Sequence, residues 1–235
     1  MILEKQSQLF DRWQKEQGYP FFVRDGIFDE EIWKDEPLKI TFVLKEANWR
    51  SENVSLCRHI LNGRSPTAWK TWNNIARWAK AILEGGEYPR YLSEEERNRL
   101  LRRVSFLNLK KVGGGRGARP REIRQAARDG AGYIREQLLL YKPDLIVCCG
   151  KWLAADILAK EALQNPALPP AFPVQDWECM DGGVFCYYTR FPGKERLTPV
   201  VSFCHPEWFT GGHGQWKIFF RQMKEARAVL LPPVL

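Results

Sequence analysis

Four short apolar runs, separated by longer segments, constrain most strongly what this chain can fold into. They are LKITFVL at 38–44, VSFLNL at 104–109, LIVCCG at 145–150 and VVSFCHP at 200–206. Runs of this kind are typical of strands covered on both faces of a parallel sheet. The segments between them are long enough for crossover helices. The sequence therefore predicts a three-layer α/β/α sandwich around a central, mainly parallel four-stranded sheet.

The remaining segments carry helix and turn signals. Residues 1–18 form an expected amphipathic helix, with Leu9, Phe10 and Trp13 on one face and Gly18 at its end. A hairpin is expected around 181–183. Further helices are expected at 66–83, 93–103, 120–141, 151–160 and 214–229. We predict one domain over 1–235, with 1–36 as an N-terminal helical extension.

Charge and aromatic content point toward a polyanionic partner. The net charge is +8, and the 235 residues include 10 tryptophans. Basic surfaces attract nucleic acid, and aromatic rings stack on bases. We therefore expect a nucleic acid as the partner, with no obligate protein partner and a monomeric chain.

Other classes of protein are disfavoured. The six cysteines form no CxxC pair, so we expect neither a metal site nor any other cofactor. The apolar runs are too short to cross a membrane. The first ten residues carry charges where a signal peptide needs an apolar core, which favours a cytoplasmic protein.

The carboxyl ends of the predicted strands should meet at one site, because ligands of open parallel sheets bind beyond that edge. The segments that follow the strands are 45–52, 108–111, 150–151 and 205–209. They offer carboxylates, an amide, a histidine, cations and aromatic rings. This set suits cleavage of a bond whose leaving group is a flat heterocycle.

Ordered motifs then indicate a family. FLNLKK, an Arg-Pro-x-Glu-Ile helix start, YKPDLIVCCG and VVSFCHP follow one another in that order. Over about 40–228, the chain resembles the uracil-DNA glycosylase superfamily, most closely the branch that carries an iron–sulfur cluster in other members. The resemblance implies that Asn108 reads a flipped base and that His205 stabilises the anionic leaving base. It also implies hydrolysis of the N-glycosidic bond.

The first motif departs from the family pattern. Members carry a Gly-x-x-Pro turn, whereas this chain has Lys-Glu-Ala-Asn-Trp at 45–49. Ala47 falls where other branches place the residue that positions water. Asn48 or Glu52 is then the first choice for that role, and Glu46 is the second.

The same departure affects the substrate and the cluster. Lys45 and Trp49 replace the usual pocket wall and would change which base fits. Val112 stands where the cluster-bearing branch has a cysteine, which argues against a cluster.

Two further groups are expected to touch DNA. A glycine-rich basic loop after 109 allows backbone N–H groups to approach phosphate, although it could be a plain surface loop. Two aromatic residues after the His-Pro motif could fill the hole left by the flipped base, or simply pack the loop. The residues are Lys110, Lys111, Arg116 and Arg119 in the first group and Trp208 and Phe209 in the second.

The expected function is therefore a monofunctional DNA glycosylase that removes uracil or a modified pyrimidine, in repair or in defence against phage DNA. One alternative is a catalytically silent DNA-binding module of the same fold. A third possibility is an α/β enzyme that handles free nucleosides or nucleotides.

Overall fold

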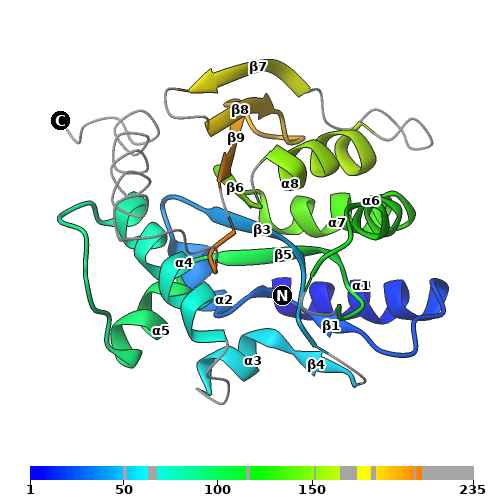
Figure 1. Cartoon of the computed structure of the whole chain (residues 1–235), viewed down its shortest axis with the longest axis horizontal. Coiled ribbons are helices and arrows are strands. Elements are labelled where there is room, and N and C mark those ends of the chain that lie inside the picture. The colour runs from blue at the N-terminus through cyan, green and yellow to red at the C-terminus, as the bar shows by residue number, and fades with distance from the viewer. Residues whose placement is uncertain are drawn as a thin grey trace.

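The computed structural model describes most of the chain (Figure 1). The described residues are 1–49, 52–62, 68–114, 117–150, 152–164, 174–180, 184–203 and 205–207, with the backbone alone for 68–69, 152, 174–180 and 184–186. The predicted helix at 214–229 therefore lies outside the described residues, as do Arg116, Trp208 and Phe209.

One sheet of seven strands forms the centre of the described structure. Its order is β2-β5-β3-β6-β9-β8-β7, and β5, β3, β6 and β9 are parallel neighbours. The α/β prediction with a parallel centre is confirmed, but the sheet is larger than the four strands expected. An antiparallel β2 extends one edge and the β7–β8 hairpin extends the other. The strands are β2 (Gly26–Ile27), β3 (Ile40–Glu46), β5 (Ser105–Lys110), β6 (Leu145–Cys149), β7 (Val174–Met180), β8 (Val184–Thr189) and β9 (Thr198–Phe203).

Helices cover both faces of this sheet (Figure 1). One face packs against α3 (Leu56–Leu61), α4 (Ala68–Leu83) and α5 (Glu94–Arg102). The other face packs against α1 (Ile2–Glu16), α6 (Pro120–Asp129), α7 (Ala131–Tyr141), α8 (Trp152–Ile157) and the π-helix η1 (Leu158–Leu163). A short helix α2 (Glu30–Asp35) precedes β3. No helix in the described ranges is both long and apolar enough to cross a membrane.

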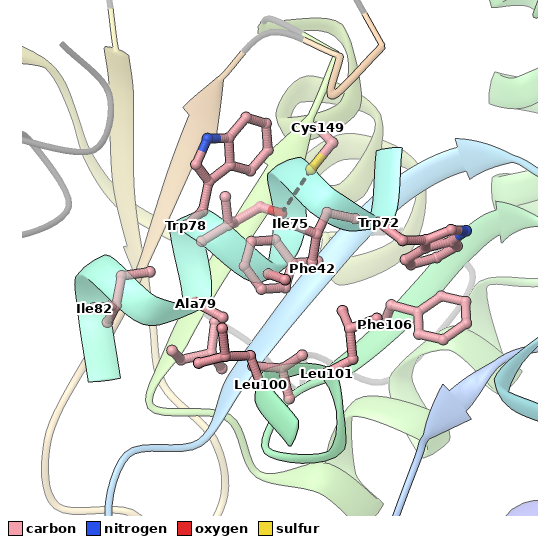
Figure 2. Close-up of a cluster of buried hydrophobic side chains, with 14 of the residues drawn as sticks. Phe42, Trp72, Ile75, Trp78, Ala79, Ile82, Leu100, Leu101, Phe106 and Cys149 are labelled. Carbon is pink, nitrogen blue, oxygen red and sulfur yellow. Dashed lines mark hydrogen bonds between the residues drawn. The ribbon is translucent and has the colours of Figure 1, made fainter. Parts of the chain in front are cut away.

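Alternation along β3 divides the core between the two faces. Phe42 points to the side of α4 and α5, whereas Val43 belongs to the opposite cluster. Figure 2 shows Phe42 among side chains of α4, including Trp78, whose ring lies 6.4 Å from that of Phe42. Trp72 and Trp78 are both buried, as the pattern of 66–83 predicts for a core helix.

The helix predicted over 120–141 is interrupted at Gly130, which divides it into α6 and α7. A Cβ on Gly130 would lie 2.4 Å from Cζ2 of Trp13. The indole of α1 therefore occupies the space that a side chain there would need, and the interruption coincides with the docking of α1.

A short parallel ribbon joins the N-terminal region to the segment after β3. In it, β1 (Val23–Arg24) pairs with β4 (Val54–Ser55). Leu9, Phe10 and Trp13 of α1 are each 1% exposed. Residues 1–36, predicted as an extension, thus contribute both to the core and to the edge of the sheet.

Candidate functional site

The strand order defines where a ligand would bind. From β3 the chain crosses first to β5 on one side and later to β6 on the other, so the connections after β3 and β6 diverge. Ligands of open α/β sheets bind at such a switch point. The two strand ends are close there, since a Cβ on Gly150 would lie 3.3 Å from Cε of Lys45. Gly150 also has a φ of +135°, which side chains rarely adopt.

An ion pair joins the ends of β3 and β5. Glu46 and Lys110 are register partners in these parallel strands, and Lys110 Nζ donates to Glu46 Oε2 at 2.8 Å. Their side chains are only 6% and 17% exposed, so the pair is poorly screened by water. Glu122 of α6 lies 3.5 Å from the same ammonium. Lys110, predicted to contact DNA, is thus engaged with two carboxylates.

The glycine loop after β5 lies directly on the turn after β3. The N–H of Gly114 donates to the carbonyl oxygen of Ala47 at 2.9 Å. A Cβ on Gly114 would lie 2.1 Å from Cδ of Glu46, and one on Gly113 would lie 1.6 Å from the carbonyl oxygen of Trp49. Only glycine permits this approach, so the loop covers the carboxylate of Glu46.

His205 follows β9 and is held as a neutral donor. Burial lowers the pKa of its imidazole, the positive charge of Lys45 lowers it further, and Glu207 opposes the shift. Its Nδ1 accepts the backbone N–H of Glu207 at 3.2 Å. In the neutral ring that bond leaves the proton on Nε2.

Helix α4 anchors the turn that contains His205. Asn74, which is 9% exposed, donates from Nδ2 to the carbonyl oxygen of Pro206 at 2.7 Å. Just before the turn, the ring of Phe203 meets Trp78 edge-on at 5.5 Å. The neighbouring strand end is tied in as well, because Gly150 N–H donates to Phe203 O at 2.8 Å.

Asn108 and Lys111 belong to a buried network instead of the strand-end site. Both the backbone N–H and the Nδ2 of Asn108 donate to Asp25 Oδ2, at 2.6 and 3.1 Å. Lys111 Nζ lies 2.6 Å from each oxygen of Asp25 and also donates to Gln137 at 3.0 Å. The side chain of Lys111 has no exposed area.

This placement corrects one prediction and limits another. A phosphate cannot reach the buried ammonium of Lys111, so the predicted DNA contact of that residue does not fit the structure. The amide nitrogen of Asn108 is already committed to Asp25, which leaves it poorly suited to read a base edge.

The remaining predicted residues lie in different surroundings. Asn48 is exposed on the turn after β3, and Trp49 beside it is half-buried. The ring of Trp49 meets that of His59 edge-on at 4.7 Å, and neither Trp49 Nε1 nor His59 Nε2 has a hydrogen-bond partner among the described residues. Glu52 is exposed, next to Asn53, which binds the N-terminal segment.

The basic loop is described in part. Arg119 is 80% exposed at the start of α6 and pairs with Glu122 at 3.2 Å. Arg116, Trp208 and Phe209 lie outside the described residues.

Sequence reasoning missed Asp25 and Asn74. Asp25 precedes Gly26, a dipeptide that signals only a turn. Asn74 sits in a helix whose tryptophans dominate the pattern. Nothing local in either segment reveals the distant partner.

The comparisons with known proteins give no family. No protein-family model matches the chain, and no curated protein matches it. One solved structure that matches is a domain of unknown function, DUF1537, from Bordetella bronchiseptica, crystallised with bound citrate as a domain-swapped dimer. It is 14% identical, with a TM-score of 0.33, and the match covers 84% of this chain and 43% of that chain. The chain thus spans less than half the length of that protein.

These findings correct the family assignment. The four ordered motifs resemble the uracil-DNA glycosylase superfamily, but no family model and no curated protein supports the resemblance. Membership of that superfamily is therefore contradicted.

Proposed function

We propose that this protein hydrolyses the N-glycosidic bond of a pyrimidine-type base extruded from DNA, leaving an abasic site. The observation that carries the proposal is the neutral His205, with its proton on Nε2, near Lys45 at the carboxyl edge of the parallel strands. Such a donor stabilises negative charge that develops on a leaving group.

The chemistry assigns a role to each group. The bond from the sugar carbon to the base nitrogen breaks, and a bond from that carbon to a water oxygen forms. The water releases one proton, and the departing base anion takes up one proton, so the step balances as hydrolysis. His205 Nε2–H donates to the leaving base, and Lys45 adds positive charge nearby. The carboxylate of Glu46 stabilises the cationic sugar or positions the water, with Asn48 as the exposed alternative for the water.

The type of donor favours a pyrimidine. A pyrimidine carries a carbonyl oxygen beside its glycosidic nitrogen, and negative charge accumulates there as the bond breaks. A purine has no oxygen at that place. Lys45 and Trp49 would then select among uracil and bulkier modified pyrimidines.

Surface charge supports the polymer as substrate. The net charge is +8, and Arg119 extends into solvent at the start of α6, beside the glycine loop. Exposed cations near a site add phosphate contacts and make binding sensitive to salt. Cys57 and Cys148 are buried thiols outside any disulfide, which is in keeping with action in the cytoplasm.

One observation favours a second candidate, a DNA-binding module without turnover. The carboxylate of Glu46 is covered by Gly114 and neutralised by Lys110. A carboxylate held in this way is less available to the sugar. Salt-sensitive DNA binding without cleavage would favour this module.

The test uses oligonucleotides that contain uracil, hydroxymethylcytosine or glucosylated cytosine, followed by alkali to cut abasic sites. We expect cleavage at one of these bases, and we expect His205→Ala to slow it by on the order of 100- to 1000-fold. Glu46→Gln should also slow it, whereas Glu31→Gln, a matched change on the exposed surface of α2, should not. The glycosylase proposal fails if no substrate is cut, and DNA affinity is then the deciding measurement. Turnover of free nucleosides alone would indicate a different α/β enzyme.

A further inference from the structure

Residues 22–25, here called the strap, lie between the two chain connections that carry the Glu46–Lys110 pair. On one side the strap binds the end of the connection after β3. The N–H of Phe22 donates to Asn53 Oδ1 at 2.8 Å, and the N–H of Val54 donates to Phe22 O at 3.2 Å. Val23 pairs with Val54 in the β1–β4 ribbon.

On the other side the strap binds the end of β5. The N–H of Val23 donates to Lys111 O at 2.8 Å. Asp25 accepts the backbone N–H of Asn108 and the ammonium of Lys111. The strap therefore fixes the segment after β3 and the segment after β5 relative to each other, and Glu46 and Lys110 lie at the start of those two segments.

Asp25 is the most strongly bound point of the strap. It is 1% exposed, and both of its oxygens are occupied, since Gln137 Nε2 also donates to Oδ1 at 2.8 Å. Gln137 extends the network to Tyr141, which bonds Gln6 of α1. A Cβ on Gly26 would lie 2.1 Å from Oε1 of Gln6, so the strap turns where only glycine fits.

The charge of Asp25 is balanced inside the protein. The titratable groups that face Asp25 and Lys111 in the described structure are Cys57 of α3 and Tyr141 of α7. Burial raises the pKa of both, and the charge of Asp25 adds to each shift, so both remain neutral. Lys111 is then the cation that compensates Asp25, and a buried charge without its partner is strongly unfavourable.

We propose that Asp25 is a positioning residue that fixes the strap to the end of β5, and through the strap fixes the segment after β3, so that the Glu46–Lys110 pair keeps its place at the strand edge. The effect of Asp25 on catalysis rests on the proposed function, whereas its effect on the position of the two segments does not. Asp25 never contacts the pair itself; it acts through Asn108, Lys111 and the strap.

The test compares Asp25→Asn with the double variant Asp25→Asn/Lys111→Met. In the single variant an amide replaces the counter-ion of Lys111. We expect faster hydrogen exchange at 45–49 and 108–114 while α4 stays protected, and kcat lower by on the order of 100-fold. In the double variant the unpaired ammonium is gone and an amide oxygen can still accept the N–H of Asn108. Hydrogen exchange at 45–49 and 108–114 and the value of kcat should therefore both return toward those of the wild type.

The pH dependence of hydrogen exchange distinguishes a positioning role of Asp25 from a general loss of stability. Burial lowers the pKa of Lys111, with Asp25 opposing the shift, so removing the charge of Asp25 lowers that pKa further. Raising the pH should then discharge Lys111 in Asp25→Asn at a lower pH than in the wild type, and protection should return as that happens. The control is Asp11→Asn, which removes an exposed carboxylate paired with Arg24 of the same strap.

Two results would overturn the proposal. One is unchanged exchange at 45–49 and 108–114 in Asp25→Asn. The other is exchange that accelerates equally in α4, because that would show a purely structural role. If the wild type cuts no oligonucleotide while Asp25→Asn selectively loses local protection, the glycosylase function fails and the positioning role stands. Should Asp25→Asn not fold, recovery of protection in the double variant decides the question.

Discussion

His205 is the residue whose protonation can be followed most directly. Because Lys45 contributes to its lowered pKa, we expect Lys45→Met to raise that pKa. The chain has three histidines, so ring protons can be titrated one by one by NMR. Lys39→Met, just before the other end of β3, is the matched control and should leave His205 unchanged. A pKa that stays constant in Lys45→Met would show that burial alone sets it.

The same shift has a consequence for stability. The folded protein binds a proton at His205 less readily than the unfolded chain, in which a histidine has a pKa of about 6.5. The stabilising contribution is therefore present at a pH above that pKa. This contribution is lost as the pH falls from the pKa of the histidine in the unfolded chain to its lowered pKa in the folded protein.

Gly114 permits a second test at this scale. Gly114→Ala would place a methyl group against the carboxylate of Glu46, so it must displace either the loop or the Glu46–Lys110 pair. We expect a loss of about 1–3 kcal/mol in the free energy of unfolding, as for other overpacked sites. Gly117→Ala is the control, because nothing lies within 4 Å of its Cβ position. Equal denaturant midpoints for the two variants would contradict the close approach.

Single residues are also where sequence reasoning reached its limit. It identified Glu46, Lys45 and His205 as strand-end groups, since strand periodicity and Gly or Pro signals locate the ends of strands. It could not foresee that Asn108 and Lys111 point into a buried network. Their partner Asp25 lies 83 residues from Asn108 in the chain, and only the folded structure brings them together.

Among the elements, α4 connects the core with the candidate site. Its buried Asn74 donates to the carbonyl oxygen of Pro206 and also accepts from Arg77 at 2.8 Å. Asn74→Ala should leave that carbonyl without its donor, costing about 1–3 kcal/mol and shifting the NMR signals of His205. Gln125→Ala, which removes an exposed amide bond to Asp129 on α6, should cost far less. If the NMR signals of His205 stay unchanged in Asn74→Ala, then α4 does not hold the turn.

Elements were predicted well where periodicity is strong and poorly where distant packing decides. The strands β3, β5 and β6, the core helix α4 and the antiparallel pair β7–β8 follow their sequence patterns. The two-residue strand β2 is too short to give a pattern of its own. The interruption at Gly130 depends on Trp13, a residue of another helix.

At the scale of the whole molecule, the N-terminal segment shares one core with the rest of the chain. The sequence shows an amphipathic helix in 1–18, but amphipathicity does not say which surface covers the apolar face. In the structure that face packs on α7, where Trp13 stacks on Tyr133 with ring centroids 5.1 Å apart. The segment also supplies β1, β2 and Asp25, so it completes the sheet edge and the buried network. A boundary near residue 36 would cut through one core.

Truncation tests this reading of the molecule. A chain that begins at residue 37 loses the buried Leu9, Phe10 and Trp13, each worth roughly 2 kcal/mol of apolar burial, and leaves Lys111 buried without a counter-ion. Those losses approach or exceed the total stability of about 5–15 kcal/mol of an ordinary domain. We therefore expect no cooperative thermal transition by circular dichroism. Arg12→Ala, a change on α1 that removes an exposed pair with Glu136 of α7, should still unfold cooperatively. Cooperative unfolding of the truncated chain near the temperature of the full chain would establish 1–36 as a dispensable extension, and Asp25 could then have no positioning role.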